Sequence, residues 1–495
     1  MKIVSTALAF LTALCVCAGS GLCEEEGSVM NAVKAGDPLP VVPEQSYKKE
    51  GENNPLYTQR FGADPGVMEY NGRLYVYMTN DTVEHNADMS VKENSYRLIK
   101  HISCISSDDL VNWTDHGLIP VAGASGVARW AGNSWAPCAA HKTVDGKEKF
   151  FLYFCNGGNG IGVLTADSPV GPWEDPLGKP LIDRSVPTCA DIIWLFDPAV
   201  MVDEDGTGYL AFGGGVPEGQ QAAPGTGRIV RLSDDMIHLD GDPVRLDVPW
   251  LFEDSGINRI GDTYVYSYCS NWQTEGNSLN LTSGAIQYMT SSNPLGPYTW
   301  QGELFPNEGR FFGLYGNNHH SIAELNGSLY LFYHSRPVEQ AMGITGNYRS
   351  PQVDRITVKE DGSLQQVRGT MAGVSQLKPL DPFREVPAST MANQAGIRVK
   401  TNGSCAVSGS AGCWLKVAGV DFASGSESLS VRASSEGGAA LYVLADSLSG
   451  PVSAVLEIPA GGELTEISVT LSLSGSHDLF FVFGADADFL SWQAH

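Results

Sequence analysis

Residues 71–80 read NGRLYVYMTN, a turn followed by a strand with alternating aromatic side chains. Asn-Gly between two apolar runs is the strongest short-range signal for a β-hairpin, and DPGVMEY at 64–70 supplies the first strand. The same plan recurs in GKEKFFLYFCNG, DGTGYLAFGGG, GDTYVYSYCSN and NGSLYLFYHSR, which start at 146, 205, 261 and 326. Successive turn glycines, from Gly72 to Gly327, are 74, 60, 55 and 66 residues apart.

Five such units fill residues 55–380. We expect four strands in each unit, and this repeat predicts an all-β fold, a five-bladed β-propeller. A β-sandwich could also supply many hairpins, but it would not repeat at this period. The 56 Gly, 18 Tyr, 18 Phe and 10 Trp of the chain are typical of short strands joined by tight turns.

Composition restricts the classes of partner. The chain has 495 residues and a formal charge of −25, from 31 basic and 56 acidic side chains. The length predicts two or three domains. A nucleic acid or an anionic membrane is not expected as a partner, because binding to phosphates requires a basic patch.

The repeat also selects residues. The first strand of each propeller blade runs beside the central axis, so equivalent positions in the blades should form a ring around it. The residues eight to ten positions before the turn glycines are Asp64, Ala136, Asp197, Glu253 and His319. Three carboxylates and one histidine are therefore expected to meet at one end of the central tunnel.

A single carboxylate at the start of a strand most often caps a turn and faces water. Three at the same repeat position indicate chemistry, because like charges gathered in a pocket shift one another's pKa values. Hydrolysis of a glycosidic bond needs a protonated carboxyl beside the leaving oxygen and an ionised carboxylate. In an inverting enzyme the second carboxylate activates a water molecule, and a third can raise the pKa of the acid.

Residues 54–380 resemble glycoside hydrolase family 43, and within it the arabinofuranosidases that act on arabinoxylan. The matching segments are NPLYTQRFGADPGVMEYNGRLYVYMTND, NSWAP, FDPAVMVDEDGTGYL, FEDSGINRIGDTYVYSYC, GNNHHSI and YRSPQVD. The resemblance implies an inverting mechanism on a five-bladed propeller. It also implies that Asp64 is the general base, that Glu253 is the general acid, and that Asp197 orients this acid and raises its pKa.

Two further positions near the axis have alternatives. Asp254 competes with Glu253 for the role of acid, but neighbouring strand residues point to opposite faces, so only one is expected to face the axis. The resemblance implies that His319 meets a structural calcium ion, largely through water. A hydrogen bond from His319 to Asp197 is the alternative role. No cofactor is expected to take part in the chemistry.

Sugar recognition needs aromatic faces and hydrogen-bond donors. Trp135 falls at the second position of the predicted ring, and Phe252 precedes the predicted acid. Arg349, in YRSPQVD, matches a family arginine that contacts the sugar, and Asn318 or its neighbour Asn317 is expected to contribute as well. We take Trp135, Asn318, Arg349 and Phe252 as the predicted substrate contacts.

A second domain is predicted over residues 381–495, where Ser, Gly, Ala and Val replace the aromatic residues. Its alternating segments predict a β-sandwich, and it resembles a family 6 carbohydrate-binding module. PAS at 387–389 and LSW at 490–492 stand where that family usually has calcium-binding acidic residues. Trp414 and Tyr442 are candidate sugar platforms, and Trp492 is a candidate core residue.

The N-terminal residues predict export. Residues 1–23 have the layout of a secretory signal peptide, with Lys2 before an apolar run, and 24–53 are expected to be a linker. In an oxidising compartment, Cys405 and Cys413 could close a hairpin disulfide.

The sequence thus predicts a secreted, monomeric, inverting enzyme that removes α-L-arabinofuranosyl branches from arabinoxylan. A β-xylosidase or arabinanase on the same fold is the alternative within the enzyme class. The alternative from a different class is a non-catalytic propeller that binds carbohydrate, but such a protein is expected to lack one of the three carboxylates.

Overall fold

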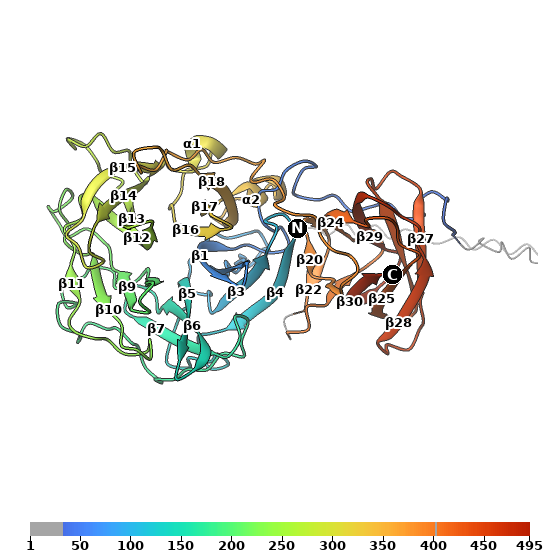
Figure 1. Cartoon of the computed structure of the whole chain (residues 1–495), viewed down its shortest axis with the longest axis horizontal. Coiled ribbons are helices and arrows are strands. Elements are labelled where there is room, and N and C mark those ends of the chain that lie inside the picture. Colours follow the sequence, from blue (N-terminus) through green and yellow to red (C-terminus); the bar gives the residue numbers. More distant parts are fainter. Residues whose placement is uncertain (1–32, 401–402) are drawn as a thin grey trace, which may run out of the picture. The chain divides into compact units, whose positions relative to one another are not determined.

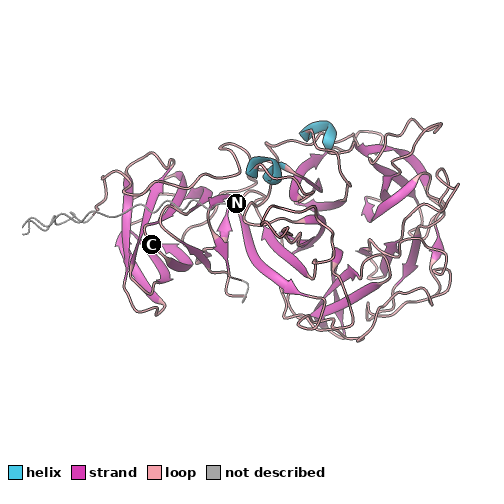
Figure 2. Ribbon diagram, turned by 180° about the vertical axis from the view of Figure 1, so that it is seen from behind, coloured by secondary structure: helices cyan, strands magenta, loops and turns pink. Residues whose placement is uncertain are grey.

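The computed structural model describes residues 33–400 and 403–495, so the predicted signal peptide lies outside the described residues. Lys34–His495 form one compact unit. Strands make up nearly all of its regular structure (Figure 2), and the helices found in the described ranges are the short α1 (Gly309–Phe312) and α2 (Pro337–Met342). No helix in the described part of the chain is long and apolar enough to span a bilayer.

Five antiparallel sheets follow one another around a common centre, coloured blue to yellow-brown in Figure 1. Blade one contains β1 (Ala63–Tyr70), β2 (Arg73–Thr79), β3 (His101–Ser107) and β4 (Trp113–Pro120). Blade two contains β5 (Trp135–Val144), β6 (Lys147–Cys155) and β7 (Ile161–Ala166). Blade three contains β8 (Ala199–Val202), β9 (Gly208–Phe212), β10 (Arg228–Arg231) and β11 (Val244–Arg245).

The remaining blades complete the circle. Blade four contains β12 (Leu251–Ile260), β13 (Thr263–Ser270), β14 (Ile286–Ser291) and β15 (Thr299–Phe305). Blade five contains β16 (His320–Leu325), β17 (Ser328–Ser335) and β18 (Ser350–Ile356). The first strands contact one another in order, β1 to β5, β8, β12, β16 and back to β1, which confirms the five-bladed propeller.

The hairpin turns explain the repeat. The five turn glycines have φ values between +60° and +83°, a region that is open to glycine and costly for most other residues. Asn71, Asp145 and Asn326, which precede three of them, also have positive φ, the pattern of type I′ hairpin turns. Both faces of β2 are buried, with Tyr75 and Tyr77 on one face and Leu74, Val76 and Met78 on the other. Tyr77, Phe150 and Trp173, for example, pack together between blades one and two.

One expectation about the blades was wrong. Within the described residues, blades two and five have three strands and not the predicted four. In blade two an isolated bridge joins Thr165 of β7 to Glu174, and in blade five an isolated bridge joins Val358 to Leu364 after β18. In blade two, prolines 169 and 172 follow β7 and cannot donate to a strand ladder.

Residues 386–494 form the predicted β-sandwich. One sheet contains β19 (Val386–Pro387), β22 (Arg398–Val399), β23 (Val407–Gly409), β30 (Ala487–Ala494), β25 (Ser428–Ser434) and β28 (Thr465–Thr470). The other contains β21 (Asn393–Ala395), β24 (Trp414–Asp421), β29 (Ser476–Phe483), β26 (Ala439–Ala445) and β27 (Val452–Ile458). The short strand β20 (Thr390–Met391) pairs with β4 and so belongs to the sheet of blade one.

The tryptophans and cysteines of the sandwich differ in how far they match the sequence predictions. Trp492 is a core residue, as predicted. Trp414 is not an open platform, because it is buried and its Nε1 donates to the carbonyl of Glu44 at 2.8 Å. Tyr442 is buried as well. The candidate disulfide between Cys405 and Cys413 is not formed: both cysteines are free, and the Cys413 thiol contacts the Gly396 carbonyl.

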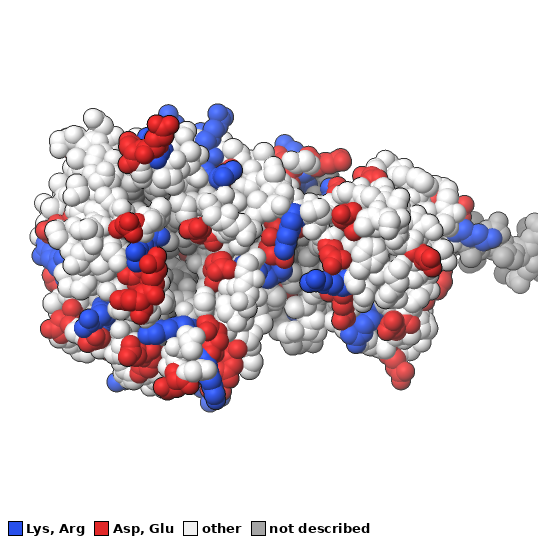
Figure 3. Space-filling model, viewed as in Figure 1, with Lys and Arg blue, Asp and Glu red and all other residues white. Residues whose placement is uncertain are grey.

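Acidic and basic side chains are interspersed over the face of the molecule drawn in Figure 3. The charge of −25 is thus carried by many separate carboxylates. The carboxylates that matter for chemistry are the few buried ones at the propeller axis.

Candidate active site

The starts of the first strands surround a pocket of about 200 Å³ at one end of the propeller axis. All five residues selected by the repeat line it, together with residues from the loops between strands. The lining residues are Asp64, Tyr96, Ile99, Trp135, Ala136, Phe196, Asp197, Phe252, Glu253, Asn317, His319 and Arg349.

An unusual backbone conformation recurs at the ring positions. Asp64, Ala136 and Asp197 have φ values of 51°, 37° and 50°, and a proline follows each of them. The pairing of β1, β5 and β12 with their second strands shifts register at this end. Such bulges re-aim side chains and are frequent beside active sites. Left-handed φ at residues other than glycine is costly and persists only where the surroundings impose it.

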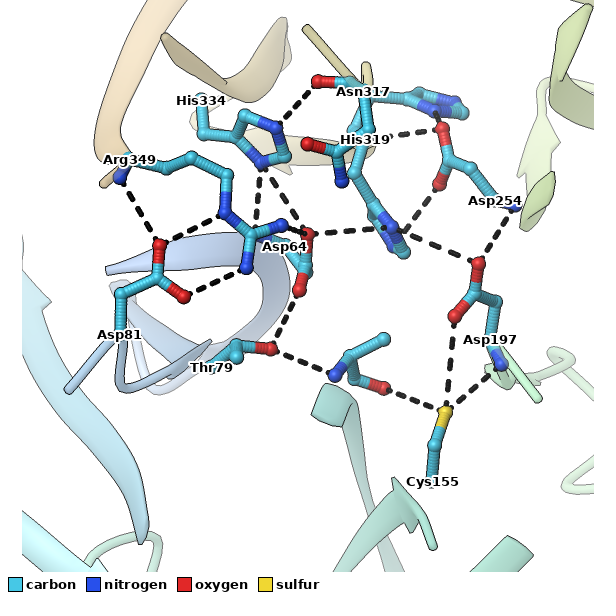
Figure 4. A network of polar contacts seen from close by, with 12 residues as sticks. Asp64, Thr79, Asp81, Cys155, Asp197, Asp254, Asn317, His319, His334 and Arg349 are labelled. Carbon is cyan, nitrogen blue, oxygen red and sulfur yellow. Dashed lines mark hydrogen bonds and ion pairs between the residues drawn. The ribbon is translucent and has the colours of Figure 1, made fainter. Parts of the chain in front are cut away.

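Asp64 lies among Arg349, Thr79, His319 and His334, with which it forms hydrogen bonds and ion pairs (Figure 4). Its Oδ1 lies 2.9 Å from Arg349 Nη1, and its Oδ2 accepts a hydrogen bond of 2.7 Å from Thr79 Oγ1. Burial alone would raise the pKa of Asp64, but the charges of Arg349 and His319, together with the hydrogen bond from Thr79, outweigh burial and bring the pKa to about 2. Asp64 is therefore negatively charged throughout the neutral range.

Glu253 has the opposite electrostatic environment. Burial, and then the negative charge of Asp197, raise the pKa of Glu253 well above its usual value. Glu253 Oε1 is buried and has no hydrogen-bond partner among the described residues. Burial also raises the pKa of Asp197 to about 7, with Asp64 and Asp254 adding to the effect and His319 opposing it. Glu253 is thus a protonated carboxyl that faces the same pocket as the ionised Asp64.

Asp254 lies beside the pocket and not in it. Its side chain is fully buried, and its Oδ1 lies 3.1 Å from His319 Nε2. Its Oδ2 accepts hydrogen bonds from the backbone and the ring of His320. The expectation that only one of the two neighbouring acids faces the pocket is in line with this arrangement. The register shift in β12 nevertheless keeps Asp254 in contact with the axial histidine.

His319 occupies the centre of the carboxylates. Its Nδ1 is 3.7 Å from Asp64 Oδ1 and 3.9 Å from Asp197 Oδ2. Burial lowers the pKa of His319, but Asp254, Asp64 and Asp197 together raise it to about 9. The hydrogen bond from His319 to Asp197 that was the alternative role is not formed, because 3.9 Å is too long for one. The ring is a cation between acids. In the described part of the chain, no group of three or more His, Cys, Asp or Glu side chains is arranged to hold a metal ion.

Three of the four predicted substrate contacts line the pocket: Trp135, Phe252 and Arg349. The fourth, Asn318, was wrongly placed. Its side chain is fully buried, and its Nδ2 donates to the carbonyls of Gly284 and Pro306. The neighbouring residue Asn317 lines the pocket instead.

Sequence reasoning missed two residues that shape the pocket wall. Tyr96 lies in the long insertion between β2 and β3, and its ring is 5.2 Å from the guanidinium carbon of Arg349. Asp81 holds the same guanidinium through two hydrogen bonds of 2.9 and 2.7 Å. The insertion has no counterpart in the repeat, so nothing pointed to Tyr96. Asp81 stands two residues after the end of β2, so its position relative to a strand of the repeat could have identified it.

The pocket therefore combines the two states that acid–base hydrolysis needs. Asp64 is ionised and can take a proton from water, whereas Glu253 is protonated and can give one to a leaving oxygen. Aromatic faces from Trp135, Phe252 and Tyr96 suit the apolar face of a sugar ring. The volume of about 200 Å³ suits a single small sugar residue.

Comparison with known proteins agrees with this chemistry. The family model described as "Glycosyl hydrolases family 43" matches residues 52–364, and "Carbohydrate binding module (family 6)" matches 387–494. An arabinoxylan arabinofuranohydrolase of Paenibacillus polymyxa is 42% identical over 92% of this chain and 74% of the relative. Another, from Bacillus subtilis strain 168, is 44% identical over 88% of this chain and 90% of the relative.

Solved structures give the same result. The crystal structure of a family 43 arabinoxylan arabinofuranohydrolase from Bacillus subtilis, in complex with cellotetraose, has a TM-score of 0.88 and 42% identity. The alignment covers 91% of this chain and 99% of that one. The chain therefore belongs to glycosyl hydrolase family 43 and carries a family 6 carbohydrate-binding module after its propeller.

Proposed function

We propose that this glycosidase removes α-L-arabinofuranosyl branches from arabinoxylan with inversion of configuration. Asp64 Oδ takes a proton from a water molecule, and the water oxygen forms a bond to the anomeric carbon. Glu253 gives its proton to the departing glycosidic oxygen as the bond from that oxygen to the anomeric carbon breaks. The products are β-L-arabinofuranose and the unbranched acceptor chain.

One observation carries the assignment of roles. Two carboxyl groups that line one pocket have pKa values displaced in opposite directions, to about 2 for Asp64 and well above the usual value for Glu253. Environments that separate two pKa values in this way distinguish a base from an acid. Asp197, whose charge is the largest electrostatic contribution that raises the pKa of Glu253, is then the modulator of the acid. The names of the two arabinoxylan arabinofuranohydrolases that resemble this chain support arabinoxylan as the substrate.

Turnover of a panel of linear and branched arabinoxylan oligosaccharides tests the proposal, with the products identified and the first anomer of arabinose followed by NMR. We expect arabinose as the released sugar, β-arabinofuranose as the first anomer, and loss of nearly all activity in Glu253→Ala. Release of xylose, or of arabinose from linear arabinan alone, would favour the xylosidase or arabinanase alternative. Retained configuration would reject the assignment of Asp64 as a base, and binding without turnover would favour a non-catalytic propeller.

The structural calcium expected near His319 stays a prediction. Calcium prefers a shell of oxygen ligands, but both ring nitrogens of His319 face carboxylate oxygens, and the ring itself carries positive charge. These residues do not suit direct coordination by the ring of His319. The proposed reaction therefore uses no step through a metal.

We also propose that the protein is exported and works as a monomer. The support for export is the signal-like composition of residues 1–23 in the sequence. Detection of the processed protein in the culture medium of the source organism tests export, and sedimentation equilibrium tests the monomeric state. Retention in the cells or a higher mass in solution would contradict the respective proposal.

A further inference from the structure

The five blades are joined around the pocket by a closed set of hydrogen bonds, which we name the inter-blade ring (Figure 4). In each bond, a backbone N–H at the start of a first strand donates to a side chain of the preceding blade. The five bonds are Asp64 N to His334 Nδ1 (3.0 Å), Ala136 N to Thr79 Oγ1 (2.8 Å), Asp197 N to Cys155 Sγ (2.9 Å), Asp254 N to Asp197 Oδ2 (3.0 Å) and His320 N to Asp254 Oδ2 (3.1 Å).

Three acceptors of the inter-blade ring occupy equivalent positions near the ends of the second strands. Thr79 pairs with the residue before Asp64, and Cys155 pairs with the residue before Ala136. His334 lies beside the same position of blade five, next to Tyr333, which pairs with His320. Blade three has Gly213 here, bonded to the Phe196 carbonyl, and glycine offers no side chain. The carboxylate of Asp197 serves as the acceptor in its place.

Each of these three acceptors also makes a second polar interaction, with a residue that lines the pocket. Thr79 accepts from Ala136 and donates its hydroxyl proton to Asp64 Oδ2 at 2.7 Å. Cys155 Sγ lies 3.8 Å from Asp197 Oδ1 as well as accepting from Asp197 N. His334 accepts from Asp64 N through Nδ1, and its Nε2 lies 2.8 Å from the carbonyl of Asn317, to which it donates.

The side chains of Thr79, Cys155 and His334 are all nearly inaccessible to solvent, so none of them can touch a substrate. Burial raises the pKa of the Cys155 thiol well above its usual value and lowers the pKa of His334 to about 3. Both groups are therefore neutral near pH 7 and can accept an N–H. They also satisfy N–H groups of residues with left-handed φ, which would otherwise be buried without a partner.

We propose that Thr79 and Cys155 are positioning residues of the two halves of the reaction: Thr79 aligns Asp64, and Cys155 aligns Asp197 and, through it, the acid Glu253. The inference rests on the roles proposed above for the three carboxylates. It assigns separate tasks to two buried side chains that are equivalent in the repeat. His334 holds Asp64 and Asn317 in the same way and completes the inter-blade ring.

The separation of tasks has a kinetic consequence. A leaving group that departs without a proton does not need Glu253, whereas a poor leaving group does. Attack by water needs Asp64 with either leaving group. The loss of kcat caused by a substitution of Cys155 should therefore depend on the leaving group, whereas the loss caused by a substitution of Thr79 should not.

The experiment compares Cys155→Ala and Thr79→Val in the full chain, with dinitrophenyl and methyl α-L-arabinofuranosides as probes. For Cys155→Ala we expect kcat with the methyl glycoside to fall on the order of tenfold or more, with little change for the dinitrophenyl glycoside. For Thr79→Val we expect a loss of kcat of similar size with both glycosides, and a small change in KM. Cys155→Ser and Thr79→Ser keep a hydrogen-bonding group, so each should restore most of the lost activity.

Equal losses on both glycosides for folded Cys155→Ala, or no restoration by Cys155→Ser, would overturn the proposal, as would leaving-group dependence in Thr79→Val. If Cys155→Ala does not fold, Cys155→Val fills the volume of the thiol without an acceptor and is judged by the same comparison. Failure of the wild-type protein to hydrolyse either glycoside would instead reject the proposed function. The two failures are thus distinguishable.

Discussion

Arg349 and Asp64 form a buried ion pair in which Nη1 lies 2.9 Å from Oδ1, while the other guanidinium nitrogens are held by Asp81. The arginine immediately precedes β18 and the aspartate lies at the start of β1, and the two residues are 285 positions apart in the chain. Asp81 thus fixes the position of the guanidinium, and the positive charge of that group stabilises the ionised form of Asp64. This relationship keeps the proposed base ionised inside a buried pocket.

Replacement of Arg349 by Met should weaken the base. Without the cation, burial dominates and the pKa of Asp64 rises from about 2. Asp64 must be ionised to act, so the acid limb of the pH profile of kcat/KM should move to higher pH, with a loss on the order of 100-fold at neutral pH. Arg355→Met, at an exposed position of β18, the strand that follows Arg349, is the matched control. An acid limb that does not move would contradict the role of this ion pair.

Replacement of Asp197 by Asn should affect the opposite limb. Burial raises the pKa of Glu253, and the charge of Asp197 is the next largest cause. Removing that charge lowers the pKa of Glu253, which must be protonated to act as the acid. The alkaline limb of the kcat/KM profile should therefore shift to lower pH, and kcat should fall. Asp262→Asn, on an exposed turn of blade four, is the control and should leave the pH profile unchanged. A wild-type pH profile in Asp197→Asn would argue against coupling between Asp197 and Glu253.

The same Asp197→Asn substitution should stabilise the fold at alkaline pH. The pKa of Asp197 is raised from 3.8 to about 7 on folding, so the folded state binds this proton more tightly than the unfolded state. Stability is then lost as pH rises from about 4 through 7. Asn carries no such charge, so the Tm advantage of the variant over wild type should be larger at pH 8 than at pH 5, by an amount equivalent to roughly 2 kcal/mol. An equal difference at both pH values would contradict the raised pKa.

Tyr96 should contribute to catalysis through its ring. The ring packs against the guanidinium of Arg349 and forms part of the pocket wall. A cation–π contact in a desolvated site stabilises by about 1–2 kcal/mol, so Tyr96→Ala should lower kcat/KM roughly tenfold. Tyr96→Phe retains the aromatic face and should stay within about threefold of wild type. Equal losses in both variants would point to the hydroxyl and not to the ring.

Gly66 should be intolerant of any side chain. A Cβ at this position would lie 2.0 Å from the Pro137 carbonyl oxygen, where blades one and two meet near the axis. Gly66→Ala should therefore cost more than about 3 kcal/mol in chemical denaturation, because backbone atoms of two strands must separate. Gly72→Ala, at a turn with φ +75° and open space, should cost only about 1–2 kcal/mol. Similar losses in the two variants would show that contact between the blades is loose.

Local signals were sufficient for the architecture and for the ring of acids. A turn glycine fixes its hairpin, and the distance from Gly72, Gly206 or Gly261 to the start of the first strand varies little. Counting from those glycines therefore reached Asp64, Asp197 and Glu253, all of which line the pocket. The division of roles among them required the resemblance to a known family, since spacing says nothing about pKa.

Contacts between distant segments were not accessible from the sequence. Asn317 and Asn318 differ by one position in an irregular loop, and only the carbonyls of Gly284 and Pro306 decide which amide is buried. The sequence suggested Trp414 as an open sugar platform, but its indole nitrogen donates to the carbonyl of Glu44 in the N-terminal segment. Tyr96 belongs to an insertion without periodicity, so no pattern could place its ring on Arg349.

The pairing of β20 with β4 has a consequence for solubility and evolution. The outer strand of a sheet exposes unpaired N–H and C=O groups, which can template pairing with another molecule. Here Thr390 and Met391 occupy that row opposite Thr114 and Trp113. Thr390 and Met391 thereby block the Trp113–Thr114 end of this edge from pairing with another molecule. A propeller joined to a different domain would need another segment to pair with Trp113 and Thr114 in place of Thr390 and Met391.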